Sequence, residues 1–310
     1  MTDARIPWVA TDPAAQRVLE LAGKVADTST TVLITGESGT GKDQLARLIH
    51  ELGPRRDAPY LKIDCASLPQ ELVESELFGH ERGAFTGAVE RKLGRLEMAG
   101  AGTIVLDEVA ALSAPTQSKL LRVLEERRFE RLGGTETLSI NARLIALTNA
   151  DLTRAVSAGT FREDLYFRLS VLTIRVPPLR ERPADILPLA DHLLARLSSV
   201  HGRPDSTFSE AARKTLQAFD WPGNVRQLRN AIERALVFAR NSKLEPSEFP
   251  ENIRNTESGI VGTMRSLEEI EREVIQATLE ATHYKISRSA EILGISRKTL
   301  LDKRKRYGLQ

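Results

Sequence analysis

Three short apolar runs stand out in the first half of the chain, and polar residues or glycine follow each of them closely. They cover positions 32–34 (Val-Leu-Ile), 104–106 (Ile-Val-Leu) and 144–147 (Leu-Ile-Ala-Leu). Runs of this length that are apolar at every position are typical of strands buried on both faces of a parallel sheet. The segment from Gln44 to Glu51 after the first run has the character of a helix. The pattern therefore predicts an α/β fold with a parallel sheet.

The pattern changes beyond residue 181. Helices are expected over 183–200, 209–219 and 224–240, and a polar stretch with two glycines and no sustained periodicity follows them. The predicted organisation is an α/β part over 1–181, a helical lid over 182–250, a linker over 251–265 and a small all-α domain over 266–310.

The first apolar run leads into a glycine-rich turn. Its residues are Gly36, Glu37, Ser38, Gly39, Thr40, Gly41 and Lys42. A strand, a glycine-rich turn and a helix form the context of a P-loop, whose backbone N–H groups converge on the β-phosphate while Lys42 reaches the β and γ oxygens. Asp43 follows, where the general pattern has Ser or Thr to ligate Mg²⁺. Either other groups mainly hold the metal, or Asp43 contacts it through water. ATP and Mg²⁺ are the expected cofactors.

Polar residues also end the two other runs. Asp107 and Glu108 follow the second run, at the strand end where parallel sheets bind ligands. We expect Asp107 to orient Mg²⁺ and its waters, and Glu108 to polarise the water that attacks the γ-phosphate. Thr148 and Asn149 end the third run and could sense the γ-phosphate. The alternative for them is a strand-end turn.

Three arginines are candidates for phosphate contacts. Arg162 and Arg168 lie six residues apart, so on one helix they point to different faces. Either could enter a neighbouring subunit's site, or simply pair with a nearby acid. Arg226 opens a later helix, and could clamp phosphate from the lid or pair with Glu233.

One segment has no role in binding a nucleotide. It is apolar, is bounded by glycines and lies between charged residues; its members are Gly83, Ala84, Phe85, Thr86, Gly87 and Ala88. Phe85 is expected to be exposed at the tip of a loop, which indicates a protein partner. The alternative is a tight turn whose Phe85 packs back onto the local core.

The net charge of +2 is too small to indicate a nucleic-acid partner, but its distribution is informative. Eight Lys or Arg against two acids lie between 285 and 310.

Cys65 is the only cysteine, which excludes an intrachain disulfide and suits a reducing cytoplasm. No apolar run approaches the ~20 residues of a membrane helix, and the start does not resemble a secretory signal.

The basic tail has the pattern of a helix-turn-helix. A short helix over 287–293, Gly294 at the turn and Ser296 as an N-cap lead into a second helix over 297–307. The residues expected to contact double-stranded DNA are Ser287, Arg288, Ser296, Arg297, Lys298, Thr299, Lys303 and Arg304. A preceding helix over 267–282, apolar at positions 267, 270, 274 and 279, is expected to dimerise the domain.

Taken together, these motifs resemble those of bacterial enhancer-binding proteins, the NtrC-like AAA+ activators of sigma-54 RNA polymerase. The resemblance runs from Trp8 to the C-terminus and rests on GESGTGKD (36–43), ESELFGHERGAFTGA (74–88), GTIVLDE (102–108), TNAD (148–151), FREDLYFRL (161–169) and WPGNVRQLRN (221–230). It implies an AAA+ ATPase with a Fis-type DNA-binding domain. The protein would activate transcription as a homo-oligomer, which the resemblance implies to be a hexamer, or as a mixed ring with a paralogue.

The resemblance also assigns residue roles. Residues 83–88 would contact sigma-54, Thr148 and Asn149 would be a first sensor, and Arg226 a second. An acidic residue at position 43 fits the family. Asp64 departs from it, because an asparagine typically stands there to hold the catalytic glutamate; we expect Asp64 to repel Glu108.

Family members commonly carry an N-terminal regulatory domain, and only seven residues precede Trp8. The expectation is that a separate protein, a partner subunit or the protein's abundance provides control. Two other hypotheses remain. One is an AAA+ ATPase that remodels DNA, which leaves 83–88 without a role. The other is a repressor with a vestigial ATPase core, and the intact Lys42 and Glu108 argue against it.

Overall fold

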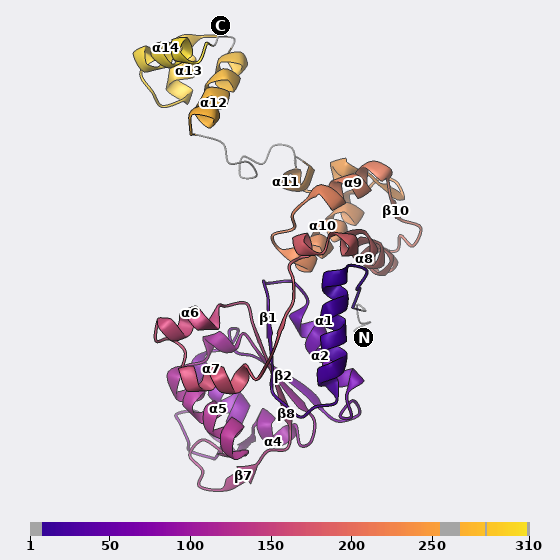
Figure 1. Cartoon of the computed structure of the whole chain (residues 1–310), viewed down its shortest axis with the longest axis vertical. Coiled ribbons are helices and arrows are strands. Elements are labelled where there is room, and N and C mark those ends of the chain that lie inside the picture. Colours follow the sequence, from indigo (N-terminus) through magenta and orange to yellow (C-terminus); the bar gives the residue numbers. More distant parts are fainter. Residues whose placement is uncertain (1–7, 255–266, 283, 309–310) are drawn as a thin grey trace. The chain divides into compact units, whose positions relative to one another are not determined.

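The computed structural model describes residues 8–254, 267–282 and 284–308 (Figure 1). The chain divides into two compact units, with the boundary between Arg254 and Asn255. The first unit contains the α/β part and the lid, and the second contains the C-terminal helices.

The α/β part is built on a five-stranded parallel sheet with strand order β2-β5-β8-β1-β9. The strands are β1 Val32–Thr35, β2 Tyr60–Asp64, β5 Thr103–Asp107, β8 Arg143–Thr148 and β9 Leu172–Arg175. The parallel α/β fold predicted from the apolar runs is confirmed. Because all the strands run the same way, their carboxyl ends meet at one edge of the sheet.

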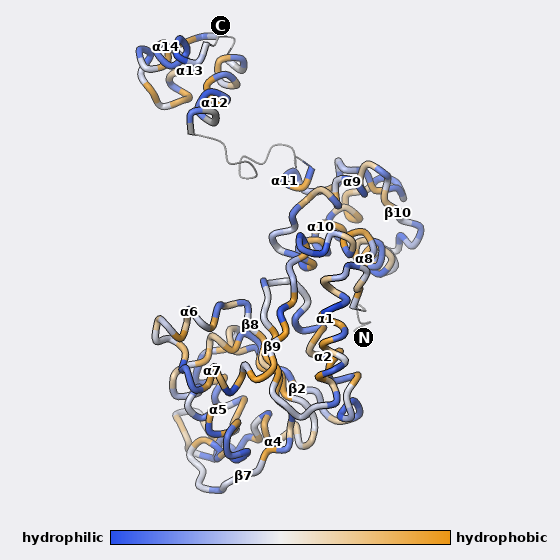
Figure 2. Tube along the Cα trace, viewed as in Figure 1, coloured by the Kyte–Doolittle hydropathy of each residue, from blue (hydrophilic) through white to orange (hydrophobic). Residues whose placement is uncertain are grey.

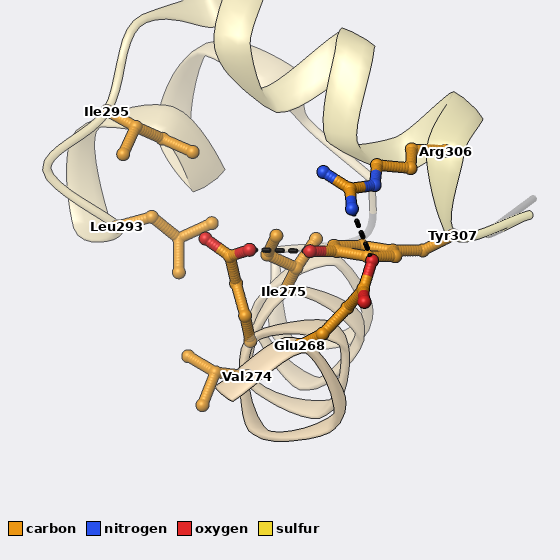
Figure 3. Close-up of a pocket in the computed structure, with 8 residues that line it drawn as sticks. Glu268, Val274, Ile275, Leu293, Ile295, Arg306 and Tyr307 are labelled. Carbon is orange, nitrogen blue, oxygen red and sulfur yellow. Dashed lines mark hydrogen bonds and ion pairs between the residues drawn. The ribbon is translucent and has the colours of Figure 1, made fainter. Parts of the chain in front are cut away.

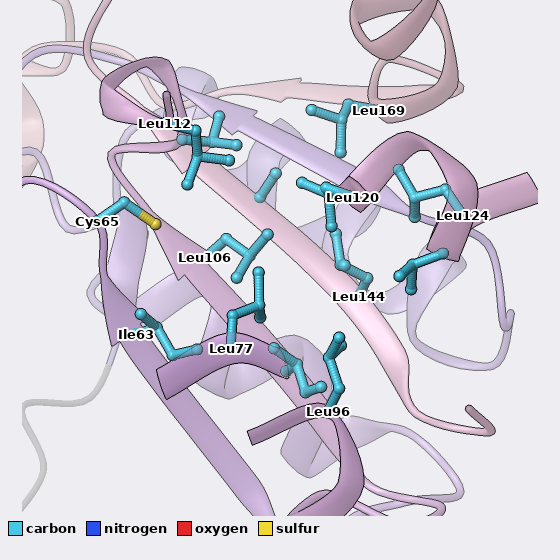
Figure 4. Packing of buried hydrophobic residues seen from close by; sticks show 14 of the residues in the cluster. Ile63, Cys65, Leu77, Leu96, Leu106, Leu112, Leu120, Leu124, Leu144 and Leu169 are labelled. Carbon is cyan, nitrogen blue, oxygen red and sulfur yellow. The ribbon is translucent and has the colours of Figure 1, made fainter. Parts of the chain in front are cut away.

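Helices cover both faces of this sheet, and alternate strand residues serve the two layers. Leu106 and Leu144 face one hydrophobic cluster, whereas Val105 and Ile145 face the other (Figure 4). The tube along the central strands is correspondingly hydrophobic (Figure 2). On the first face lie α3 Gln70–Phe78, α4 Arg95–Met98, α5 Ala114–Glu126, α6 Leu152–Ser157 and α7 Glu163–Leu169, and on the second lie α1 Pro13–Ala26 and α2 Lys42–Leu52.

Two small antiparallel hairpins extend from the first face. One pairs β3 (Gly79–His80) with β4 (Lys92–Leu93), and the other pairs β6 (Arg128–Glu130) with β7 (Thr137–Ser139). Backbone contacts join them, since Leu132 N–H donates to the carbonyl of Gly79 at 2.9 Å. Residues 83–88 lie in the connection of the first hairpin.

The lid has its own hydrophobic core around the fully buried Trp221. Its elements are α8 Ile186–Val200, α9 Glu210–Ala218, α10 Asn224–Phe238, α11 Glu251–Arg254, β10 Thr207–Phe208 and β11 Lys243–Leu244. Single 3-10 turns span Val109–Ala111, Leu179–Glu181, Pro183–Asp185 and Pro246–Glu248.

The start of the linker predicted over 251–265 is wrong, because 251–254 are helical and Ile253 packs in the lid core. Residues 255–265 lie outside the described residues.

In the described residues of the second unit, three helices surround a small core. They are α12 Leu267–Ala281, α13 Ile286–Ile292 and α14 Arg297–Arg306, and the core residues are Ile275, Leu279, Ala290 and Leu300. The turn between α13 and α14 contains Gly294 at a φ of 66°, which favours glycine. Every helix in the described parts of the chain is too short or too polar to cross a membrane.

Candidate functional site

The glycine-rich turn connects β1 to α2 at the carboxyl edge of the sheet. Gly39 has a φ of 80°, and a Cβ there would come within 2.6 Å of the carbonyl oxygen of Gly223, so the close approach requires glycine. The Lys42 ammonium donates to the carbonyls of Gly36 at 2.8 Å and Glu37 at 3.2 Å. Burial lowers the pKa of Lys42. A lysine ammonium beside the N-terminus of an eleven-residue helix makes an anion-binding turn.

Two carboxylates lie beside this turn and share one cationic partner. Asp107 ends β5, and Asp43 lies in the first turn of α2. The ammonium of Lys62, from β2, lies 2.9 Å from Oδ1 of Asp43 and 2.8 Å from Oδ2 of Asp107. The structure thus brings Asp43 and Asp107 within reach of a single cation. Neither the P-loop motif nor the acidic strand motif indicated Lys62.

Glu108 connects the acidic strand end to β8. Its Oε2 accepts a hydrogen bond from the backbone N–H of Asn149 at 3.0 Å, and its Oε1 lies 4.0 Å from Nζ of Lys42. Thr148 is fully buried, and its hydroxyl accepts from the N–H of Ala150 at 3.0 Å. The structure therefore shows the strand-end turn that was the alternative for Thr148, while the backbone of Asn149 orients Glu108.

Asp64 is turned toward its own loop. Its Oδ1 accepts hydrogen bonds from the N–H groups of Ala66 at 3.0 Å and Ser67 at 3.1 Å. Among the contacts of the described residues none joins Asp64 to Glu108, so the repulsion expected between these two carboxylates has no counterpart in this structure.

The lid contacts the glycine-rich turn directly. The amide of Asn224 donates to Oε2 of Glu37 at 3.2 Å and to the carbonyl of Ser38 at 3.1 Å. The guanidinium of Arg180 donates to Glu37 at 2.9 Å and lowers the pKa of that carboxyl to about 2. Arg226 donates to the hydroxyl of Ser38 at 2.7 Å. The position of Arg226 beside the turn favours the phosphate clamp over the alternative of a pair with Glu233.

These groups surround a cavity of about 270 Å³. Its lining combines the turn, the acidic strand end and the lid; the residues are Ser38, Gly39, Gly41, Lys42, Asp43, Gln44, Lys62, Asp107, Glu108, Val225, Arg226 and Arg229. The sequence motifs did not indicate Arg229 either, although it lies one helical turn beyond Arg226. Four cationic and three anionic side chains suit a polyphosphate with a metal ion.

Arg162 and Arg168 lie away from this cavity. Arg162 occupies the N-cap position of α7, and its guanidinium pairs with Asp164 at 2.7 Å, which is the local ion pair considered for it. Arg168 donates to the carbonyl of Leu124 at 3.1 Å. Neither lines the cavity that contains Lys42.

The segment 83–88 is a compact turn. Gly83 N–H donates to the carbonyl of Ala88 at 2.8 Å, and Gly87 has a φ of 109°. Phe85 is 42% exposed, and its ring meets the His80 ring edge-on at a centroid distance of 5.0 Å. Each of the two alternatives for Phe85 is therefore partly right. Its ring packs against its own hairpin, and part of the ring is still exposed.

A buried arginine lies beneath this turn. The side chain of Arg131 is 2% exposed and binds three glutamates, Glu81 and Glu136 at 2.9 Å and Glu97 through two bonds of 2.8 and 3.0 Å. Arg131 belongs to the hairpin of β6 and β7, whereas Glu81 lies two residues before Gly83, in the connection of the other hairpin. The cluster therefore fastens one hairpin to the other.

The helix-turn-helix presents the predicted basic residues at the start of α14. Arg297 and Lys298 are exposed, and the hydroxyl of Ser296 accepts from Thr299 N–H at 3.0 Å as an N-cap. In α13, Ser287 is exposed and Arg288 pairs with Glu291 at 2.8 Å. These residues are accessible at the face expected to meet DNA.

The end of α14 makes contacts within the domain that the sequence did not indicate. Lys303 donates to Glu271 of α12 at 2.7 Å. The Tyr307 hydroxyl donates to the same carboxylate at 2.6 Å, and Arg306 pairs with Glu268 (Figure 3). The Lys303 ammonium holds α14 to α12 in this structure, and its contact with DNA stays a prediction.

The predicted DNA contact of Arg304 stays a prediction, whereas α12 differs in part from the prediction made for it. The Arg304 guanidinium lies 5.9 Å from the centre of the Tyr284 ring. Of the positions predicted to mediate dimerisation, Leu279 is in the domain core, whereas Val274 is exposed and lines a groove of about 580 Å³. The side chains at 267 and 270 lie outside the described residues.

Comparisons with known proteins agree with this architecture. Residues 8–175 match the family model described as the sigma-54 interaction domain, 180–261 match the AAA+ ATPase lid domain, and 266–307 match the bacterial regulatory protein, Fis family.

Relatives match the chain over almost its whole length. The transcriptional regulatory protein FlbD of Caulobacter vibrioides is 40% identical over 99% of this chain and 71% of FlbD. The alginate biosynthesis regulator AlgB of Pseudomonas aeruginosa is 46% identical over 96% of this chain and 66% of AlgB. The crystal structure of NtrX from Brucella abortus superimposes with a TM-score of 0.77 at 36% identity, over 97% of this chain and 69% of NtrX. The chain thus spans about two thirds of these relatives.

The fold and the site define an AAA+ ATPase with a helical lid and a Fis-type helix-turn-helix domain. The chain belongs to the family of sigma-54-dependent transcriptional activators, as its motifs predicted.

Proposed function

We propose that this activator binds upstream DNA and uses ATP hydrolysis to remodel the closed complex of sigma-54 RNA polymerase. The observation that carries the proposal is the single cavity in which Lys42, Asp107, Glu108 and the lid residue Arg226 converge. Brucella abortus NtrX has been solved in complex with ADP and with ATP, at 35% and 34% identity to this chain, which supports a nucleotide in the same place.

The residues present fit a magnesium ion bound together with a nucleotide. Asp43 and Asp107 are close enough to share the Lys62 ammonium, and carboxylate oxygens are ligands that Mg²⁺ prefers. Within the described ranges, no group of three or more His, Cys, Asp or Glu could hold a metal. This agrees with Mg²⁺, which takes one or two carboxylates and completes its shell with waters and phosphate oxygens. When bound, it would neutralise charge on the β- and γ-phosphates.

The protein groups around the phosphates have separate tasks. Lys42 and the N–H groups at the start of α2 would hold the β- and γ-phosphates, while Arg226 would contact them from the lid. Glu108, oriented by the N–H of Asn149, would accept a proton from the attacking water.

Hydrolysis is proposed to need more than one subunit. Arg162 and Arg168 are exposed or partly exposed on α7 and lie away from their own cavity, so in a ring they could supply charge to a neighbour's γ-phosphate. Such an arginine contributes on the order of 10³–10⁵ in rate. The assembly would be a ring, either of six copies of this chain or mixed with a paralogue.

The 83–88 turn is proposed to contact sigma-54. Its partly exposed Phe85 and the adjacent Thr86 form a surface that the nucleotide site does not use. DNA binding through Arg297 and Lys298 would raise the local concentration of the activator near the promoter.

The test is a reconstituted transcription assay at a sigma-54 promoter, run beside ATPase measurements. Wild type is expected to open the promoter, and Thr86→Ala to hydrolyse ATP without opening it. Val89→Ala, a change at a 74% exposed residue just outside the turn, is the control and should retain both activities. If wild type hydrolyses ATP briskly but never activates, the remodelling of polymerase by this chain alone is refuted.

A further inference from the structure

Lys62 occupies a position that the proposed chemistry does not explain. Its ammonium joins carboxylates from two different elements, Asp43 of α2 and Asp107 of β5, at 2.9 and 2.8 Å. The Lys62 side chain is 34% exposed, so water screens these pairs only in part. Burial alone would lower the pKa of Lys62, but hydrogen bonds to Asp107 and Asp43 outweigh it and keep the pKa above its ordinary value. The group is a cation at neutral pH.

The same two carboxylates are the proposed protein contacts of Mg²⁺. An ammonium is satisfied by carboxylate oxygens at hydrogen-bond distance, whereas Mg²⁺ requires oxygen ligands at about 2.0–2.1 Å. Two cations cannot both fill the space between Asp43 and Asp107, because they repel each other at that separation. Lysine is suited to leaving such a position, since its charge sits at the end of a flexible four-carbon chain.

We infer that Lys62 is a built-in competitor for the metal site, and that it sets the affinity of the nucleotide complex for its divalent cation. This inference rests on the proposed nucleotide site. The apparent Kd of the metal is the intrinsic Kd divided by the fraction of molecules in which the ammonium has left the carboxylates. If the ammonium is in place in about nine of ten molecules, the metal binds about tenfold more weakly than the carboxylates alone would allow.

The test uses Mn²⁺ as a probe, because it takes the same oxygen ligands and is visible by electron paramagnetic resonance. Binding is titrated to the full chain with saturating ADP. Lys62→Met removes the charge and keeps an unbranched side chain, and it is expected to lower the Kd of Mn²⁺ about tenfold. Lys62→Arg keeps the charge and should bind Mn²⁺ no more tightly than wild type. Lys24→Met, at an exposed lysine of α1, removes the same charge elsewhere and should leave the Kd unchanged.

Binding of a fluorescent ADP analogue in EDTA verifies that each variant folds, because the P-loop contacts do not need the metal. Lys62→Gln replaces Lys62→Met if the latter fails this step. If the variant without the lysine charge binds Mn²⁺ with the same or a lower affinity than wild type, Lys62 does not compete and the inference is wrong. If wild type shows no Mn²⁺ binding that depends on ADP, the proposed metal site itself fails, which is a different result.

Discussion

Replacing Arg131 with methionine tests whether the two hairpins depend on one buried charge. The Arg131 side chain is 2% exposed and makes four hydrogen bonds to three glutamates. Arg131→Met keeps much of the aliphatic volume and removes all four bonds. Glu81 and Glu97 would then lose the cation that offsets their mutual repulsion.

The size of the effect follows from the exposure of these partners. Removing one member of a fully buried ion pair costs about 3–5 kcal/mol. The side chains of Glu81, Glu97 and Glu136 are 33%, 26% and 66% exposed, so water can solvate them again once Arg131 is gone. We therefore expect a loss of about 2–3 kcal/mol in the free energy of unfolding. For a unit of this size that loss lowers the Tm by about 5–10 °C.

The assay is thermal unfolding followed by ATPase and promoter-opening measurements below the Tm. Because Arg131 lies outside the cavity, the variant should keep its ATPase activity. Promoter opening should fall, because the hairpin of β6 and β7 would no longer hold the 83–88 turn in place. Arg91→Met is the matched control, since Arg91 is half exposed and approaches Glu81 and Glu97 only at 3.8 and 4.0 Å. Its cost should be at most about 1 kcal/mol. Equal Tm values for the two variants would refute the reasoning.

Three further predictions address other parts of the molecule. Because Arg180 lowers the pKa of Glu37 to about 2, the stability that this pair provides is fully present above the unfolded pKa of 4.5 and is lost as the pH falls through the folded value. The stability advantage of wild type over Glu37→Gln in urea should thus shrink from pH 6 to pH 3, and an advantage independent of pH would contradict this. Ser296→Ala removes the bond to Thr299 N–H and should destabilise the helix-turn-helix by about 1 kcal/mol with weaker DNA binding in a mobility-shift assay, whereas unchanged unfolding would show that the cap is dispensable. Asp64→Asn should leave the ratio of ATP hydrolysed to promoters opened unchanged, because the asparagine oxygen can accept the same bonds from Ala66 and Ser67, and a changed ratio would show that Asp64 takes part in the coupling.

The central strands could be predicted from the sequence because both of their faces are buried. β1, β5 and β8 occupy the middle of the sheet and appear as uninterrupted apolar runs. The edge strands β2 and β9 have a buried residue at only one position each, so their sequences carry no such signal.

The candidate site likewise contains residues that a local sequence pattern predicts and residues that only the fold brings together. The P-loop and the acidic strand end are local patterns, and a local pattern can be found in one sequence. Lys62, Arg131 and Asn224 gain their partners through contacts between residues distant along the chain, which no spacing indicates. The ion pair of Lys303 with Glu271 has the same origin, because its two members lie on different helices and 32 residues apart.

Helix α5 joins the two regions that the proposed function must couple. At its start, the buried Gln117 accepts from the backbone N–H of Arg162 at 2.9 Å, and nearer its end the carbonyl of Leu124 accepts from Arg168 at 3.1 Å. The same helix continues into β6 and the hairpin that contains Arg131. Packed helices transmit displacement because close-packed interiors deform little. An arginine drawn toward a neighbour's γ-phosphate would therefore pull on α5, and through Arg131 on the hairpin beneath Phe85.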